Sequence, residues 1–193
     1  LHLCNKNMEN MDTNNNDGKA KHDLLLDVCM AAKYEGNSIN THYPPHQEKY
    51  KYTGTASQLC TVLARSFADI GDIVRGRDLY LGDKGEKKQL QDSLKKIFKK
   101  IHKEVTSGSN VKTLKDRYKD DREKNYFQLR EDWWTANRHT VWKAITCGAG
   151  ESDKYFRQTA CGTGTPTHKQ CRCGDRDVTI VPTYFDYVPQ YLR

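Results

Sequence analysis

The sequence predicts an all-α, cysteine-rich helical bundle, and three observations support this fold class. First, apolar residues recur with a period near that of an α-helix in four separate segments. Second, the chain has only five prolines and few alternating β-branched stretches, which disfavours an all-β fold. Third, seven cysteines among 193 residues indicate covalent cross-links or a metal site that holds the helices together.

The N-terminal third predicts one helix between two loops. Residues 1–20 are rich in asparagine, and we expect a polar loop there. A helix follows over residues 22–35, with Leu24, Val28, Ala31 and Ala32 on one face, and Gly36 is placed to end it. Residues 37–56 contain a Pro-Pro pair and several tyrosines, and therefore predict an extended surface loop.

The middle of the chain predicts two amphipathic helices. The second helix covers residues 57–75, with Ser57 as its N-cap and with Asp69 and Asp72 facing away from its apolar side. Gly76, or the GDKG turn at 82–85, ends it. The third helix covers residues 87–105, with one apolar arc formed by Leu90, Leu94, Ile97, Phe98, Ile101 and Val105. Residues 106–126 are polar and basic, and we expect a loop.

All three tryptophans lie in the fourth predicted helix, within residues 129–148. Helical spacing aligns Leu129, Trp133, Ala136, Thr140 and Ala144, and Trp134, Val141 and Ile145 widen this line on one flank. An apolar arc of this width is typical of a helix buried on more than one side. We therefore interpret Trp133, Trp134 and Trp142 as core residues rather than as an aromatic platform for a ligand.

The positive charge of the chain is concentrated in one region. The formal net charge is +7, and residues 84–122 alone carry 13 Lys/Arg and 6 Asp/Glu, which accounts for the whole excess. On the third helix, five lysines lie opposite the apolar arc: Lys95, Lys96, Lys99, Lys100 and Lys103. Residues of the following loop extend the charge: Lys112, Lys115, Arg117 and Lys119. This pattern indicates either a solvated face or a site for an anionic partner such as a sulfated glycan.

The cysteines allow two interpretations. An oxidising compartment favours disulfides among the seven residues, which are Cys4, Cys29, Cys60, Cys147, Cys161, Cys171 and Cys173. Alternatively, a zinc-stabilised domain could use Cys161, His168, Cys171 and Cys173 as ligands, although C-x-C is not the usual knuckle spacing. We expect most cysteines to be oxidised, with at most one free thiol and no bound metal.

The sequence offers little support for catalysis or nucleic-acid binding. The seven histidines are scattered, and no nucleophile with a neighbouring base can be recognised, so we expect neither an enzyme nor a cofactor. A basic helical domain that binds nucleic acid is a second alternative, but the third helix lacks interleaved aromatic residues. No apolar run is long enough to span a bilayer, and no secretion signal is present. The first residue is Leu, and we expect the chain to be a piece of a longer protein.

Several long segments together resemble one protein family, the Duffy-binding-like domains. The segments are DLLLDVCMAAKYEG at 23–36, ARSFADIGDIVRGRDLYLG at 64–82, LREDWWTANRHTVWKAITCG at 129–148, CRC at 171–173 and PTYFDYVPQYLR at 182–193. They are most similar to the alpha class, from the erythrocyte membrane protein 1 variant antigens of the malaria parasite. The resemblance implies that residues 1–174 form the helical second subdomain and that residues 175–193 begin the third.

The resemblance also implies a function. Such a domain would mediate cell adhesion on the outer face of the infected red cell, with a membrane anchor elsewhere in the parent protein and no enzymatic activity. It would bind receptors on host erythrocytes or endothelium, including heparan-sulfate-like glycans and blood-group sugars, and so support rosetting. Its surface would vary antigenically and be recognised by antibodies. The family further favours disulfides over zinc.

Overall fold

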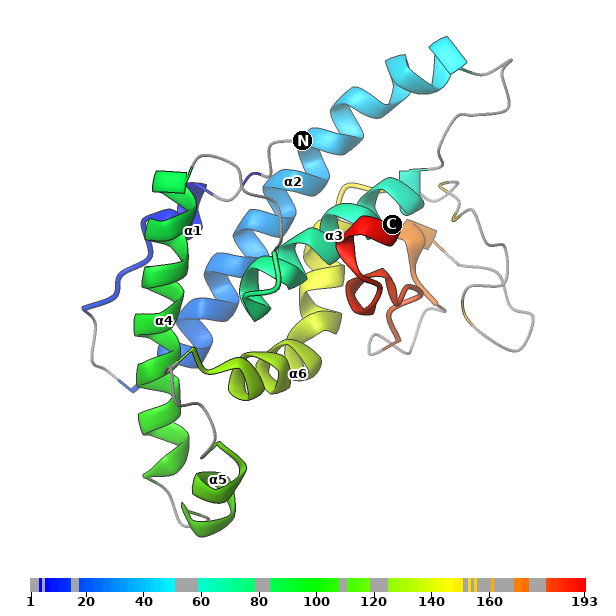
Figure 1. Cartoon of the computed structure of the whole chain (residues 1–193). Helices are drawn as coiled ribbons and strands as arrows, with labels where there is room; N and C mark the ends of the chain where they lie inside the picture. Colours follow the sequence, from blue (N-terminus) through cyan, green and yellow to red (C-terminus); the bar gives the residue numbers. More distant parts are fainter. Residues whose placement is uncertain are drawn as a thin grey trace.

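Helices form all the regular structure in the described part of this computed structural model, and no β-strand occurs there (Figure 1). The structure describes residues 4, 6–14, 18–50, 59–78, 84–107, 111–118, 125–150, 153, 155, 161, 169–173 and 180–193. The helices are α1 (Lys6–Glu9), α2 (Ala20–Tyr50), α3 (Leu59–Arg75), α4 (Lys84–Thr106), α5 (Val111–Arg117) and α6 (Phe127–Ile145). Three 3-10 turns follow, η1 (Lys169–Cys171), η2 (Phe185–Tyr187) and η3 (Gln190–Leu192). The predicted all-α fold class is confirmed.

Helix α6 lies at the centre of the molecule. It packs against both α2 and α3, while α4 runs along one side and α5 lies beside the C-terminal end of α4 (Figure 1). All three tryptophans are buried, with Trp134 fully inaccessible. The ring of Phe67 on α3 lies 5.1 Å from that of Trp134 and 5.2 Å from that of Trp142, so α3 and α6 share one aromatic core.

The buried arc of α6 is rotated relative to the predicted one. Ala136, which we placed on the central apolar line, is exposed, whereas Arg130 is buried. The centre of the arc passes through Trp134, Val141 and Ile145, because α2 and α3 cover that side of the helix. Helical spacing alone fixes which residues share a line, but the neighbouring helices decide which line is innermost.

Helix α2 is longer than predicted. We expected it to end at Gly36 and to be followed by a loop over residues 37–56, but the helix continues to Tyr50 through Pro44 and Pro45. Residues 51–56 lie outside the described residues. A Cβ atom at Gly36 would lie 1.9 Å from the backbone oxygen of Ile145. Gly36 therefore allows α2 to approach the end of α6 closely, and this packing outweighs the local tendency of glycine to end a helix.

The predicted N-terminal and basic loops both contain a short helix. Helix α1 falls within residues 1–20, and Met8 and Met11 are buried beside α2 and α4. Helix α5 falls within residues 106–126. Both helices are too short to give a clear periodic signal, and their packing against longer helices is what holds them.

The boundaries of α3 and α4 match the sequence more closely. Helix α3 ends at Arg75 as predicted, and Gly76 follows with a left-handed φ of 73° that favours glycine. The predicted N-cap Ser57 lies outside the described residues. Asp72 was expected to face solvent but is buried, because it forms an ion pair with Arg75 and also contacts Arg193.

The C-terminal segment, residues 180–193, packs against α3 and α6. Its Asp186 is buried and accepts hydrogen bonds from the indole nitrogen of Trp134, at 2.9 Å, and from Nε of Arg138, at 2.8 Å. The segment therefore shares polar contacts with the helical core. The division at residue 174 into two subdomains stays a prediction.

Replacing Gly36 with alanine should strongly destabilise the fold. An alanine in an open helix stabilises by up to about 1 kcal/mol relative to glycine. Here the added methyl group meets the backbone of Ile145, so we expect a loss of about 2 kcal/mol or more in the free energy of unfolding. Denaturant melts would measure it, with Lys33→Ala on the exposed side of α2 as the control. An unchanged or raised stability would contradict the close approach of α2 and α6.

Replacing Trp133 with alanine should cost about 3–5 kcal/mol in the free energy of unfolding, through lost burial and the cavity left behind. Gln128→Ala, at an exposed position of the same helix, should change stability by less than about 0.5 kcal/mol. The same denaturant melts compare the two. A loss below about 1 kcal/mol for Trp133→Ala would show that this side chain is not part of the core.

Candidate glycan-binding surface

Helix α4 separates its apolar and basic residues onto opposite sides. Leu90, Leu94, Ile97, Phe98 and Ile101 are buried against the rest of the molecule. On the outer side, Lys96, Lys99 and Lys103 are exposed. Burial of the apolar arc therefore forces these three ammonium groups into water on one face of the helix. We call these three residues the lysine row. No ion pair of these lysines is found among the residues that the structure describes.

The other two lysines of the predicted stripe lie at its edges. Lys95 and Lys100 are half-buried, so the structure does not bring all five lysines onto one fully exposed face. Lys95 lines a cavity between α3, α4 and α6. Helical spacing places these two residues away from the centre of the lysine row, where neighbouring elements cover them.

The basic residues after α4 differ in whether they are paired within the protein. Lys115 on α5 is exposed and extends the charge beyond the C-terminal end of α4. Arg117 forms a bidentate ion pair with Asp132 of α6, with N···O distances of 2.6 and 2.7 Å. The hydrogen bonds from Arg117 lower the pKa of the Asp132 carboxyl group, and Arg117 is engaged within the protein. The side chain of Lys112 and all of Lys119 lie outside the described residues.

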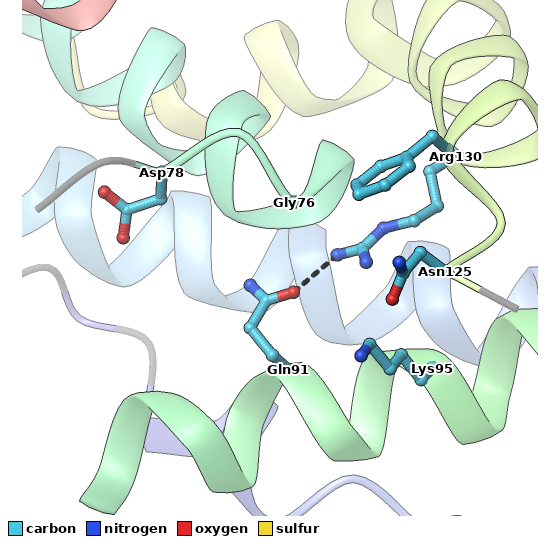
Figure 2. A pocket seen from close by; sticks show the side chains of 7 residues that line it. Gly76, Asp78, Gln91, Lys95, Asn125 and Arg130 are labelled. Carbon is cyan, nitrogen blue, oxygen red and sulfur yellow. Dashed lines mark hydrogen bonds between the residues drawn. The ribbon is translucent and has the colours of Figure 1, made fainter. Parts of the chain in front are cut away.

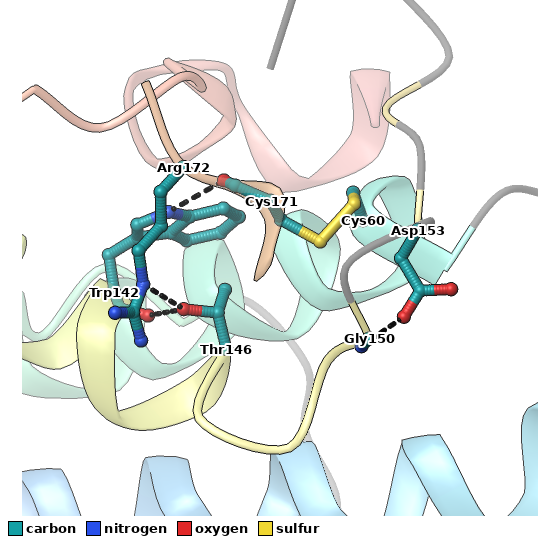
Figure 3. Close-up of a disulfide and its surroundings, with 7 residues drawn as sticks. All are labelled: Cys60, Trp142, Thr146, Gly150, Asp153, Cys171 and Arg172. Carbon is teal, nitrogen blue, oxygen red and sulfur yellow. Dashed lines mark hydrogen bonds between the residues drawn. A yellow bond between two sulfur atoms is a disulfide. The ribbon is translucent and has the colours of Figure 1, made fainter. Parts of the chain in front are cut away.

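Two disulfides fix the segment after α6. Cys60 on α3 is bonded to Cys171, with their Cα atoms 5.5 Å apart and a sequence separation of 111 (Figure 3). Beside this bond, the indole nitrogen of Trp142 donates to the backbone oxygen of Cys171, and Arg172 donates to Thr146 (Figure 3). Cys161 is bonded to Cys173. The Cys60–Cys171 disulfide closes a long segment of the chain, and it therefore strongly restricts the conformations of the unfolded state.

Three cysteines are not in disulfides, which corrects our expectation of at most one free thiol. Cys4, Cys29 and Cys147 are free, because the helix packing places none of them in bonding contact with another cysteine. Burial raises the pKa of Cys29 to about 11. The pKa of Cys4 is also raised, first by burial and then by the nearby Glu35.

The disulfides contradict the zinc alternative. The sulfur atoms of Cys161, Cys171 and Cys173 are each bonded to another sulfur, whereas a zinc ligand must be a thiolate. His168, the fourth proposed ligand, lies outside the described residues. Within the described ranges, no group of three or more histidine, cysteine or acidic side chains could hold a metal ion.

Sequence reasoning missed two buried charged residues inside the helical core, Glu35 and Arg130. Arg130 of α6 is 1% exposed, and Glu35 of α2 is 4% exposed and accepts a hydrogen bond from Ser66 of α3 at 2.9 Å. A signal for Arg130 was available, because it lies three and four residues before Trp133 and Trp134 and therefore shares their face. A charged residue on an aromatic face indicates a buried, paired group.

The helical fold agrees with comparisons to known proteins. The family model described as the Duffy binding domain matches residues 1–193. The chain belongs to the Duffy binding domain family. This is a family of adhesion-type domains and not a known enzyme family. A comparison with curated proteins gave no match.

Solved structures show the same relationship. The NTS-DBL1(alpha-1) domain of Plasmodium falciparum membrane protein 1 (PfEMP1) from the varO strain is 42% identical, with a TM-score of 0.72; the match covers 99% of this chain and 40% of that one. The NTS-DBL1-alpha and CIDR-gamma double domain of the same strain is 40% identical, with a TM-score of 0.72 and coverage of 99% and 25%. The ICAM-1-binding PfEMP1 IT4var13 DBLbeta domain is 32% identical, with a TM-score of 0.65 and coverage of 99% and 39%.

These solved relatives are longer than the chain, which spans about two fifths or less of each of them. The resemblance to the alpha class is confirmed by the two DBL1-alpha structures. Among the described helices, none combines the length and apolar character needed to cross a membrane.

We expect the three free thiols of this chain to differ in reactivity. Cys147 is exposed and should react rapidly with Ellman's reagent at pH 8, whereas Cys4 and Cys29 should react slowly because their raised pKa values leave little thiolate. Cys147→Ser should remove the fast phase. The unfolded, unreduced protein should release three thiols in total; fewer than three would reveal a further disulfide.

Proposed function

We propose that this domain mediates adhesion by binding sulfated glycans, such as heparan sulfate, through the lysine row of α4. The observation that carries the proposal is the exposure of Lys96, Lys99 and Lys103 together on one face, without ion partners among the described residues. Membership of an adhesion family supports it. Lys95, Lys100 and Lys115 would contribute at the edges.

The physical basis is relief of charge repulsion by a linear polyanion. Lys96 and Lys103 are seven positions apart, or about 10 Å along the helix at 1.5 Å per residue, and Lys99 lies between them. A chain of sulfate groups running along α4 would meet all three ammonium groups and release the counterions of both molecules. Each exposed contact contributes little, so affinity depends on several lysines acting together.

Relatives of this domain suggest its biological setting. The DBL1-alpha relatives belong to a Plasmodium falciparum membrane protein, and another relative is described as binding ICAM-1. By analogy, the parent protein of this domain would be a variant surface antigen on infected erythrocytes, anchored outside these residues. Its partners would be receptors on host erythrocytes or endothelium, including blood-group sugars in rosetting, and antibodies would recognise its variable surface.

The test reverses the charge of the row. The triple variant Lys96→Glu/Lys99→Glu/Lys103→Glu should bind heparin at least about tenfold more weakly and with a shallower dependence on salt, because fewer counterions are released. Affinity measured at two salt concentrations gives both values. A DNA column run in parallel separates glycan binding from general attraction to polyanions.

The chain offers a control with a matched change in net charge. Lys21, Lys33 and Arg65 are exposed on α2 and α3, and replacing all three with glutamate changes the charge by the same amount. This control variant should keep most of its heparin affinity, since it changes the overall electrostatic field of the domain but not the lysine row. Equal losses in the two triple variants, or no loss in the α4 variant, would contradict a site on the lysine row.

A further inference from the structure

A cavity of about 220 Å³ opens beside the lysine row, between the end of α3, the first half of α4 and the start of α6 (Figure 2). The residues that line it are Gly76, Asp78, Gln91, Lys95, Asn125, Phe127 and Arg130. Lys95 extends from α4 into the space below Asn125 and the guanidinium group of Arg130 (Figure 2). The cavity is thus reached from the same helix that carries the lysine row.

The wall of the cavity is held by a buried hydrogen-bond network. Arg130 donates to the backbone oxygens of Val74 at 2.6 Å and Ile73 at 3.1 Å, and to Oε1 of Gln91 at 2.8 Å. Gln91 in turn donates to the oxygen of Ile73 at 3.1 Å. These bonds satisfy backbone carbonyls at the end of α3 and hold the Arg130 guanidinium in one orientation. The site is therefore organised before any ligand arrives.

The charge of the cavity is positive. Of its seven lining residues, Lys95 and Arg130 are cationic and Asp78 alone is acidic. Lys95 is half-buried, and its ammonium group has no ion pair with the described residues. Phe127 is the first residue of α6, so the positive end of the helix dipole also lies beside the cavity; Tyr126 provides no side-chain cap there. An anionic group would be stabilised by all three sources of positive potential.

We propose that this cavity binds one sulfate group of the glycan chain, with Lys95 as its ion partner and Asn125 and Arg130 facing it. The inference rests on the proposed function and extends it, because it gives the glycan a fixed starting point beside the lysine row. The volume of about 220 Å³ is below the range of about 300–1,000 Å³ for drug-sized pockets, which favours a small group such as one sulfate over a longer piece of the glycan. Phe127, which is 51% exposed, offers an apolar ring to the sugar.

Titration with a sulfated heparin disaccharide tests the cavity, because so short a ligand cannot follow the whole lysine row. The readout is the NMR signals of the side-chain amides of Asn125 and Gln91. We expect saturable shifts in the wild type and about tenfold weaker binding for Lys95→Gln, which removes a charged contact from a half-buried site. The neighbouring exposed variant Lys96→Gln should weaken binding less than about twofold. Thermal melts confirm that both variants are folded.

Several results would overturn the proposal: no saturable shifts, or equal effects of Lys95→Gln and Lys96→Gln. Equal shifts with the desulfated disaccharide would exclude sulfate as the recognised group. Equal shifts with inorganic sulfate at the same concentration would show a site for a free anion, not for a glycan. The triple variant of the lysine row keeps Lys95. If it binds the disaccharide normally but long heparin at least about tenfold more weakly, both proposals stand. If it binds both normally, the cavity stands and the lysine row fails.

Discussion

The burial of Trp134 is the interaction on which most of this domain depends. Its ring packs against Phe67 of α3, and its indole nitrogen donates to Asp186 in the C-terminal segment. One side chain of α6 therefore joins two elements that are far apart in sequence. A buried indole removes a large apolar area from water, and its N–H group requires a partner, so both the packing and the polar contact are constrained.

Asp186 extends this constraint into a buried ionic network. Besides Trp134, it accepts two hydrogen bonds from Arg138 at 2.8 Å, and its backbone oxygen contacts Arg75. Arg75 also pairs with Asp72, which contacts Arg193 near the C-terminal end of the segment. Charges removed from water are tolerated only when they are paired in good geometry. The network therefore selects one arrangement of α3, α6 and residues 180–193 over alternatives that would leave a charge unpaired.

The same core determines how the surface can function. Because Leu94, Phe98 and Ile101 of α4 are buried, the orientation of this helix is fixed, and the direction of the lysine row follows from it. The Cys60–Cys171 disulfide and the Trp142 contact hold the opposite end of the molecule. Exposed residues on such a scaffold can change without loss of the core, which suits an adhesion-type domain.

The sequence by itself determined the helices α3, α4 and α6, the burial of the tryptophans and the exposure of Lys96, Lys99 and Lys103. These features follow from helical periodicity, which is a local property. Only the tertiary structure decided that α2 continues past Gly36, that Lys95 lines a cavity, that Asp72 and Arg130 are buried, and that Cys60 pairs with Cys171. Each of these depends on a neighbour distant in sequence: Ile145 lies against Gly36, and the two cysteines have a sequence separation of 111. Such proximity is set by the packing of whole helices, and no local pattern encodes it.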